Sequence, residues 1–421
     1  MLMEVGDHII AHTKAGDMQG VVLPSSTKKT FVLKLSSGYN VGVPRKNVKT
    51  VSLVEKMKVT KEKDIKKIAH SVKKKTIAIL HTGGTIASKV DYATGAVVAK
   101  YSPEEIVDMF PELEQLANIR SRLISNMSSD DMRFSHYNTM AKEVAKEIKE
   151  GADGIIITHG TDTIASSSAA LSFILEDLPV PVLFVGSQRS SDRGGTDAFL
   201  NLMSAVYFML ESDFAEVGLC MHKGLSDDLC VILPGLKCRK MHSSRRDAFH
   251  AINAEPYAEV HFLEKKIHIL DHSYTKKSTK ELQLQLFKEV KIGWLRSRPQ
   301  MFASELKAFS KYHGLLLEGT GMGHMPIGSD KENEKILAEL KKLCKKMPVV
   351  MSLQTLSGRV DMHVYSPGRT LLDIGVLGNY SDMHPETAYI KLAWLVSNHP
   401  KEVRELFGKD LRGELRSRTV Q

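Results

Sequence analysis

Two threonine-containing turns carry residue types that suit acyl transfer. Thr85 lies in ILHTGGTIAS (79–88) and Thr161 lies in IIITHGTDTIASSSAAL (155–171), and each turn follows an apolar run typical of a strand. A threonine hydroxyl becomes an effective nucleophile when a neighbouring group takes its proton. Ligands of open α/β sheets bind at the carboxyl ends of strands. The two turns therefore predict a site for nucleophilic attack on a bound substrate.

Each turn also has a simpler interpretation. Gly83 and Gly84 let the backbone approach a ligand closely, but a phosphate-binding turn of the P-loop type would need the G-K-[ST] sequence that is absent here. In the second turn Thr161, Asp162 or Thr163 could cap the helix that follows. Capping and catalysis are compatible, because a helix N-terminus also stabilises a bound carboxylate.

Lys240 is a candidate base for one of these hydroxyls. It lies in GLKCRKMHSS (235–244). A lysine that is desolvated beside a hydroxyl can take its proton, as in Ser-Lys variants of the catalytic triad. Taken by itself, Lys240 would be interpreted as a charge on the surface.

The elements that would position these residues alternate along the chain from Thr76 onward. Continuous apolar runs typical of buried strands alternate with segments of helical periodicity, and this order indicates a parallel sheet covered by helices on both faces. A hairpin is expected at 257–270. The strand-like runs are 76–80, 154–158, 181–186, 217–221, 291–297, 314–319 and 348–353, and the helical segments include 135–151 and 198–210.

The predicted domain organisation has five parts. Short strand-like runs at 8–13 and 20–24, and two more within 31–43, indicate a small all-β, barrel-like domain before the α/β body. The bounds are residues 1–54 for the β domain, 55–75 for a basic linker, 76–271 for a large α/β domain, 272–288 for a second linker and 289–421 for a smaller α/β domain.

The positive charge of the chain is concentrated at its N-terminal end. Residues 1–76 hold 16 Lys and Arg against 6 Asp and Glu, whereas the other residues hold 42 against 43. Such asymmetry can mark a nucleic-acid contact, and a solubilising linker would look the same.

Composition excludes several other classes of protein. No apolar run approaches the ~20 residues that span a bilayer, and the N-terminus lacks the order of a signal peptide, so we expect a cytoplasmic protein without membrane contact. The four cysteines form no C-x-x-C pair and no H-E-x-x-H occurs, so we expect no metal site.

Together the three segments resemble the asparaginase/glutaminase family over residues 76–420. The family has T-G-G-T-I-A after its first strand and H-G-T-D-T after a later one, and both are present here. The resemblance implies an asparaginase-like two-domain body and hydrolysis of a side-chain amide through a threonyl ester. It assigns catalytic roles to Thr85, Thr161, Asp162 and Lys240.

The resemblance also implies residues that bind the substrate. Tyr92 matches the tyrosine of the family's lid, Ser128 matches the residue that holds the α-carboxylate, and Ser129 follows it. Gly84 is a candidate for backbone contact with the substrate. Asp197 and Asn201, in GSQRSSDRGGTDAFLNLMSAV (186–206), match a segment that we interpret as mainly structural.

The stretch GLLLEGTGMGHMP (314–326) resembles the part of the family that reaches the neighbouring subunit's site. A homodimer formed through the asparaginase-like body is therefore expected.

The N-terminal extension carries a second resemblance. An asparaginase-like body behind a small β domain resembles the D subunits of archaeal glutamyl-tRNA(Gln) amidotransferases. This implies release of ammonia to an E subunit that binds tRNA and converts Glu-tRNA(Gln) to Gln-tRNA(Gln), in an α2β2 assembly that contacts tRNA(Gln) indirectly. ATP and Mg²⁺ would then belong to the partner, and this chain needs no cofactor.

Two alternatives stay open at the level of sequence. One is a free-standing cytoplasmic L-asparaginase with an accessory barrel, and the other is a scaffold protein that keeps the fold without the activity. The sequence leaves undetermined which threonine carries the acyl group, whether glutamine or asparagine is preferred, and where ammonia leaves.

Overall fold

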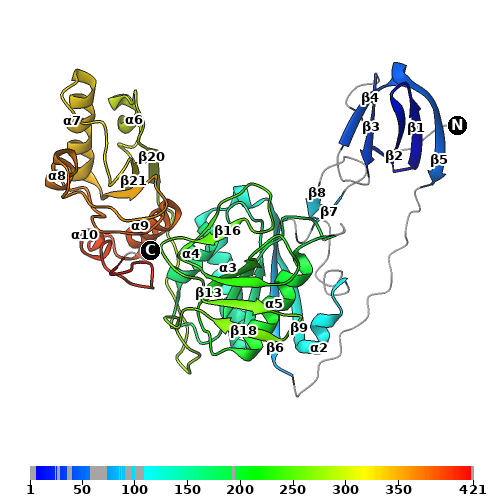
Figure 1. Ribbon diagram of the computed structural model, residues 1–421. Helices are drawn as coiled ribbons and strands as arrows, with labels where there is room; N and C mark the ends of the chain where they lie inside the picture. The colour runs from blue at the N-terminus through cyan, green and yellow to red at the C-terminus, as the bar shows by residue number, and fades with distance from the viewer. Residues whose placement is uncertain are drawn as a thin grey trace.

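A computed structural model shows a small β domain followed by a two-domain α/β body (Figure 1). Thr85 and Tyr92, two of the predicted site residues, lie outside the residues that the structure describes. The structure describes residues 6–23, 25, 29–35, 40–56, 74–84, 86, 88–90, 97–99, 109–191 and 195–418.

The N-terminal domain is an antiparallel sheet with the strand order β4-β3-β2-β1-β5. Its core is small and includes Ile9, Phe31 and Leu33. The sequence predicted strands in the first four positions but not the fifth, whose side chains are mostly exposed and whose apolar alternation is weak. The elements are β1 (His8–Thr13), β2 (Gly16–Leu23), β3 (Thr30–Leu35), β4 (Asn40–Pro44), the 3₁₀ turn η1 (Arg45–Asn47) and β5 (Val48–Glu55).

The large domain is built on an eight-stranded mixed sheet. Five neighbouring strands are parallel, and the three at one edge are antiparallel to their neighbours. The expected hairpin at 257–270 is confirmed, and it provides the two outermost strands. The order is β18 (Lys266–Ile269), β17 (Ala258–His261), β14 (Cys230–Pro234), β13 (Val217–His222), β12 (Val182–Val185), β10 (Gly154–Thr158), β6 (Thr76–Gly83) and β9 (Asn118–Met127).

The apolar strands are buried because helices cover both faces of this sheet. Side chains of β6 alternate between the faces: Ala78 and Leu80 join one core, and Ile77 and Ile79 join the other. The first core is shared with α3 (Phe134–Lys149) and α4 (Ile164–Ile174), and the second with α2 (Glu112–Leu116) and α5 (Ala198–Glu211). This burial explains why the strands show no polar alternation in the sequence.

The large domain also contains two short strand pairs outside its main sheet. The elements are β7 (Ser88–Val90) with β8 (Val97–Ala99), and β15 (Cys238–Lys240) with β16 (Phe249–Ala251), each pair antiparallel. The segment predicted as the second linker, 272–288, contains β19 (Gln283–Leu284), which pairs with β11 (Leu175–Glu176) on the large domain.

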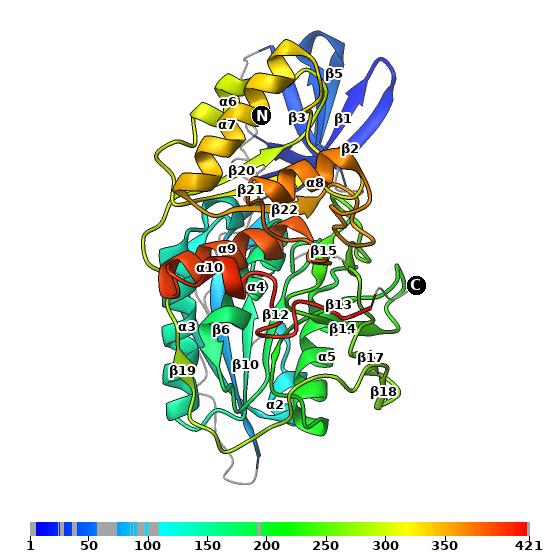
Figure 2. The ribbon, with the colours of Figure 1, turned by 90° about the vertical axis from the view of Figure 1, so that its left-hand side faces the viewer.

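The small domain has a three-stranded parallel sheet in sequence order. Helix α9 (Pro385–Asn398) joins the two domains of the body because it packs on α4 and on β21 (Gly314–Gly319), as Figure 2 shows. The ring centroid of Trp394 on α9 lies 5.4 Å from that of Phe173 on α4. The elements are β20 (Ile292–Arg296), α6 (Ala303–Lys307), β21 (Gly314–Gly319), α7 (Lys331–Lys346), β22 (Val349–Leu353), α8 (Ser366–Asp373), α9 (Pro385–Asn398) and α10 (Val403–Leu406).

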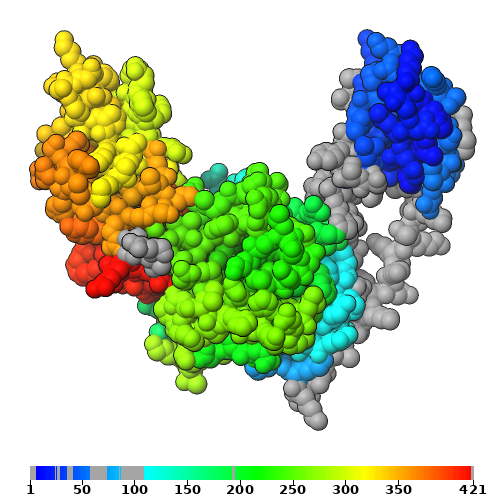
Figure 3. All heavy atoms as spheres, viewed as in Figure 1, coloured from blue at the N-terminus to red at the C-terminus, as the bar shows by residue number. Residues whose placement is uncertain are grey.

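The C-terminal segment after α10 runs back onto the body. Glu414 is fully buried against Lys391 of α9, and Arg416 binds Asp271 of the large domain. These two ion pairs fix the two domains of the body against each other. The small domain, yellow to red in Figure 3, rises from one side of the large domain.

Candidate active site

The two predicted turns lie side by side because the strands before them are neighbours. Strands β6 and β10 are parallel, and Thr158 at the end of β10 pairs with His81 of β6. Their carboxyl ends therefore meet at one edge of the sheet, which is where ligands bind in this class of fold.

Gly84 brings the first turn into contact with the second. Its φ is +80°, and a Cβ placed on it would lie 2.5 Å from Gly160 N and 2.6 Å from Gly160 Cα. Only glycine leaves room for so close a contact, so the backbone of the first turn packs directly on the backbone just before Thr161. Thr85 is the next residue after Gly84, and its own structure lies outside the described residues.

Ser128 and Ser129 lie at the same edge, where β9 ends. Ser129 begins the 3₁₀ turn η3 (Ser129–Asp131) and is buried, and a Cβ on Gly160 would lie 2.8 Å from its Oγ. Thr163 Oγ1 donates a 2.7 Å hydrogen bond to the carbonyl oxygen of Ser129. The structure thus brings Gly84 and Ser129 into contact with the second turn, and Ser128 is the residue before Ser129, with its Oγ 3.4 Å from Asp130 Oδ2.

Lys240 completes a contact with the second turn from the other side. Its Nζ donates to Thr161 Oγ1 at 2.9 Å and to Asp162 Oδ1 at 2.8 Å. The Lys240 side chain is 13% exposed and that of Asp162 is 63% exposed, while Thr161 is buried. A lysine and a hydroxyl at this distance can exchange a proton, and the carboxylate stabilises the charged amine.

The capping interpretation of this turn is wrong for its side chains. Helix α4 begins at Ile164 with Thr163 as the N-cap residue, and no side chain makes a capping hydrogen bond there. The hydroxyl of Thr161 faces Lys240 instead. Helix α4 still begins directly after this turn, and a helix N-terminus favours an anionic ligand.

A buried histidine braces the second turn, and the sequence did not single it out. His159 Nδ1 lies 2.8 Å from the carbonyl oxygen of Gly160, and His159 Nε2 lies 2.8 Å from Ser167 Oγ on α4. A carbonyl only accepts, so Nδ1 carries the proton and Nε2 accepts from the serine. Burial lowers the pKa of His159 to about 4, so the ring is neutral.

A second buried histidine supports the first turn. His81 Nδ1 lies 2.8 Å from Thr158 Oγ1, and its Nε2 lies 2.8 Å from Ser121 Oγ on β9. Burial lowers the pKa of His81 to about 4. The ring links three neighbouring strands immediately below the two turns.

Asp197 and Asn201 make structural contacts around the neighbouring loop. The Asp197 carboxylate accepts the backbone N–H groups of Gln188 and Arg189 at 2.9–3.0 Å, and Asn201 Nδ2 donates to Gly186 O at 3.0 Å. A Cβ on Gly186 would lie 2.8 Å from Thr161 Cγ2, so the methyl group of Thr161 packs directly on this loop.

A cavity of about 360 Å³ opens beside Asp162 and Lys240. Its wall includes Glu386 at the start of α9, which binds Arg239 at 3.0 Å and His384 at 2.9 Å. Burial opposes the charge of this carboxylate, but His384 and Arg239 outweigh burial and lower the pKa of Glu386. Glu386 follows the last predicted strand by more than thirty residues, and no spacing in the sequence connects it to Lys240.

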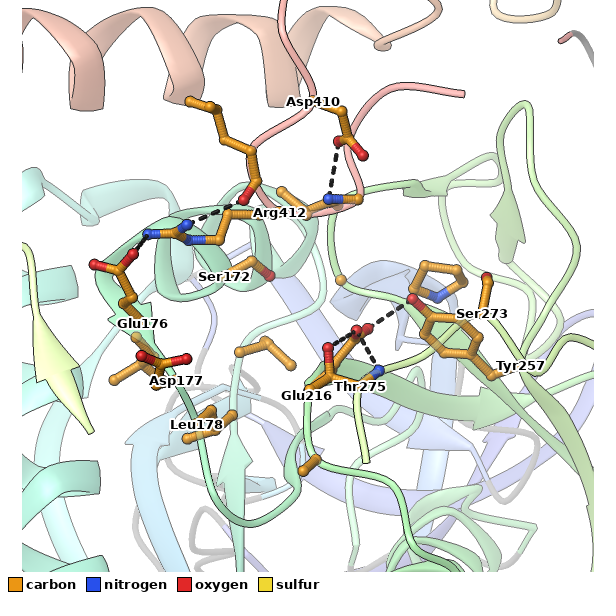
Figure 4. Close-up of a pocket in the computed structure, with 18 residues that line it drawn as sticks. Ser172, Glu176, Asp177, Leu178, Glu216, Tyr257, Ser273, Thr275, Asp410 and Arg412 are labelled. Carbon is orange, nitrogen blue, oxygen red and sulfur yellow. Dashed lines mark hydrogen bonds and ion pairs between the residues drawn. The ribbon is translucent and has the colours of Figure 1, made fainter. Parts of the chain in front are cut away.

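A larger cavity, of about 450 Å³, lies at the other end of α4 beneath the C-terminal segment (Figure 4). Its carboxylates are engaged within the chain: Glu176 binds Arg412 at 3.0 Å, and Glu216 accepts from Tyr257 and Thr275 at 2.7 Å. It contains none of the predicted site residues, so we assign the chemistry to the edge that holds Thr161.

Two features are missing from the part of the chain that the structure describes. No group of three or more His, Cys, Asp and Glu residues in that part could hold a metal ion. No helix in the same residues is both long and apolar enough to cross a bilayer.

Family comparisons cover all three domains. Residues 3–54 match the GatD N-terminal domain, residues 76–274 match the family described as Asparaginase, N-terminal, and residues 291–407 match the Glutaminase/Asparaginase C-terminal domain. The D subunit of the glutamyl-tRNA(Gln) amidotransferase from Methanobrevibacter smithii is 39% identical over 427 residues, which cover 99% of this chain and 94% of that protein. The chain belongs to the family of glutamyl-tRNA(Gln) amidotransferase D subunits.

Other members and solved structures agree with this assignment. The corresponding D subunit from Pyrococcus furiosus is 40% identical over 98% of this chain and 95% of its own length. The L-asparaginase from Thermococcus kodakarensis is 28% identical with a TM-score of 0.71, and the match covers 82% of this chain and all of that one. L-asparaginase I from Vibrio cholerae has the same TM-score and identity. This member of the D-subunit family therefore has a body of the asparaginase family of amidohydrolases, as the resemblance implied.

Proposed function

We propose that this chain hydrolyses the side-chain amide of glutamine or asparagine through a threonyl ester. The observation that carries the proposal is the contact of Lys240 Nζ with both Thr161 Oγ1 and Asp162 Oδ1. It lies where Gly84 meets Gly160, at the carboxyl ends of two parallel strands.

The reaction needs one nucleophile, one base and donors for the oxyanion. Thr161 or Thr85 attacks the amide carbon while Lys240 takes the hydroxyl proton. Lys240 then passes this proton to the amide nitrogen, the C–N bond breaks, and the nitrogen leaves as ammonia. Water then attacks the ester, releases the acid product and restores the threonine. Backbone N–H groups around Gly84 and Thr161 are candidate oxyanion donors, each worth roughly 2.7–4 kcal/mol in comparable sites.

The substrate would be held by residues at the same edge. Ser128 and Ser129 lie beside the second turn and suit an α-carboxylate that also faces the N-terminus of α4. Tyr92, from the segment after the first turn, would orient Thr85, as the family resemblance implies.

Ammonia from this site would serve a partner subunit in the cytoplasm. An E-type subunit would bind tRNA, use ATP with Mg²⁺, and convert Glu-tRNA(Gln) to Gln-tRNA(Gln). Two chains of each kind would form α2β2, with this chain dimerising through its asparaginase-like body. Support comes from the match of residues 3–54 to the GatD N-terminal domain and from the names of its relatives.

Removing either hydroxyl tests the site. Thr161→Val and Thr85→Val keep the side-chain volume nearly constant, and each should lower ammonia release from glutamine and asparagine by about 10³-fold or more. Thr139→Val, at an exposed position of α3, is the matched control and should behave like the unmodified chain. Near-normal turnover in both site variants would show that the assignment is wrong.

Adding the partner separates the two physiological roles. Glutaminase turnover is measured for the chain alone, with an E subunit, and with E subunit, Glu-tRNA(Gln) and ATP. We expect strong stimulation by the complete set. Equal turnover in all three mixtures, without a complex on gel filtration, would favour a free-standing L-asparaginase.

A further inference from the structure

His222, the last residue of β13, is fully buried between two hydrogen-bond acceptors. Its Nδ1 lies 2.6 Å from Asn201 Oδ1, and its Nε2 lies 3.1 Å from Asp227 Oδ1. The carboxylate of Asp227 is 58% exposed and accepts only. The ring nitrogen beside it must therefore carry a proton.

The amide of Asn201 is oriented by its other contacts. Its Nδ2 donates to Gly186 O at 3.0 Å and to Asp197 Oδ2 at 3.3 Å, and both of these atoms are acceptors. The amide oxygen therefore faces His222, and the second ring nitrogen must carry a proton as well. The geometry points to an imidazolium at His222.

Charged and titratable groups around the ring favour this state. Burial opposes the charge of the ring, but contacts with Cys230, Asp227 and Asp197 outweigh burial, so the pKa of His222 is raised above its ordinary value of 6.5. The groups that face it from the surrounding elements are Cys220 of β13, Cys230 of β14, Asp197 before α5, Asp227 of the loop after β13, and Arg246, which binds Asp227.

Two chains of contacts lead from His222 to the catalytic pair. The first runs through Asn201 to Gly186, against which the methyl group of Thr161 packs. The second runs through Asp227 to Arg246, which lies in the loop that follows Lys240 and also binds the carbonyl oxygen of Leu225. His222 therefore connects the support of Thr161 to the segment that carries Lys240.

We propose that His222 is a positioning residue: as a buried cation it ties the support of Thr161 to the Lys240 segment and thereby sets turnover. The proposal rests on the function proposed above. A neutral ring has only one N–H, so it can donate a hydrogen bond to Asn201 or to Asp227 but not to both. One of the two series of contacts is then broken at His222. Because the folded pKa is raised, this linkage is complete below pH 6.5 and is lost as the pH rises through the folded pKa.

The protonation state is measured directly on the intact chain. Side-chain ¹⁵N NMR of histidine-labelled protein at pH 6.5 should show both nitrogens of His222 protonated, because its pKa is raised above 6.5. His222→Gln identifies the signal. A neutral His222 at this pH overturns the proposal, whether or not the chain releases ammonia.

The link to turnover is tested at Asp227, whose exposure allows replacement without loss of the fold. Asp227→Asn should lower kcat for ammonia release at pH 8 by about tenfold with little change in KM, since it loosens the Lys240 segment and leaves the substrate contacts intact. It should also move the alkaline fall of activity to lower pH, because a nearby negative charge is lost.

Asp228→Asn is the matched control for this measurement. Asp228 is the exposed neighbour of Asp227, and its Oδ1 accepts from the N–H of Leu229. Its profile should coincide with that of the unmodified chain. Identical pH profiles for Asp227→Asn and the unmodified chain would overturn the positioning role. Complete absence of ammonia release from the unmodified chain would overturn the proposed function itself.

Discussion

The turns after β6 and β10 contain similar residues but are fixed by different means. In the turn after β10, side chains hold the backbone: His159 binds Ser167, and Lys240 binds Thr161. In the turn after β6, Thr82 Oγ1 also donates to Thr158 O at 2.9 Å, but close backbone packing is the main restraint on the path. Gly83 has a φ of +107°, and a Cβ on it would lie 2.6 Å from Met127 O.

This difference predicts two kinds of response to substitution. A turn fixed by backbone packing has no space for a side chain, so a single methyl group displaces the whole turn. A turn fixed by hydrogen bonds loses one contact at a time, and each loss has a limited effect. A substitution in the first turn should therefore cause a large loss of turnover, whereas a substitution in the second turn should lower turnover by a limited factor.

Gly84→Ala should have the largest effect. The new methyl group would lie 2.5 Å from Gly160 N, so the two turns must separate, and turnover should fall by at least about 100-fold. Gly151→Ala is the matched control, since its φ of +82° equals that of Gly84 within 2° but no atom lies within 4 Å of the added Cβ.

The two variants separate steric conflict from backbone strain. Gly151→Ala should cost only the ~1–2 kcal/mol of a left-handed residue and leave turnover unchanged. Ammonia release and denaturant unfolding provide the two measurements. Equal losses of activity in both variants would show that the close approach of Gly84 to Gly160 has no importance for the site.

The strands and helices around the site followed from the sequence. β6, β10, β12 and β13 appear as predicted because buried parallel strands read as uninterrupted apolar runs, and α3 and α5 follow from their helical periodicity. The antiparallel pairing of β14 was not predicted, since an apolar run carries no information about strand direction.

The site itself was predicted only in part. The family motifs identified Thr161, Asp162 and Lys240, and the structure brings these residues into contact. The roles of these residues, and those of Thr85 and Tyr92, stay predictions. His81 and His222 were not predicted, because each binds a residue far away along the chain, Thr158 and Asn201 respectively. His222, for example, meets residues 201 and 227 only after folding.

The buried histidines below each turn predict how stability depends on pH. The pKa values of His81 and His159 are lowered to about 4, so the unfolded chain binds more protons than the folded chain between pH 4 and 6.5. The free energy of unfolding should therefore fall as the pH falls below 6.5, by about 1 kcal/mol per histidine per pH unit.

Chemical denaturation between pH 6 and pH 5 tests this dependence. His222 is charged in both the folded and the unfolded chain in this range, so it does not offset the effect of the two neutral rings. His159→Gln should lower the slope to roughly half, because only His81 then contributes. A stability that stays constant between pH 6 and pH 5 would contradict the assignment of neutral rings to both turns.

Ser167→Ala should have the smallest effect and should show the graded response of the second turn. The serine hydroxyl donates to His159 Nε2 at 2.8 Å, and its loss leaves a buried acceptor without a partner, at a cost of about 1–3 kcal/mol. His159 keeps its bond to the carbonyl oxygen of Gly160, so Thr161 stays near Lys240 and turnover should fall only a few-fold.

Ser397→Ala is the matched control: this serine is also fully buried on a helix, but its Oγ has no hydrogen-bond partner in the described part of the chain. Removing an unpaired hydroxyl should leave the free energy of unfolding unchanged or slightly higher. Urea unfolding at pH 7.5 compares the two variants, and equal stabilities would mean that the serine does not brace the turn. A loss of turnover in Ser167→Ala as large as that in Gly84→Ala would contradict the distinction between the two turns, since both would then depend on a single contact.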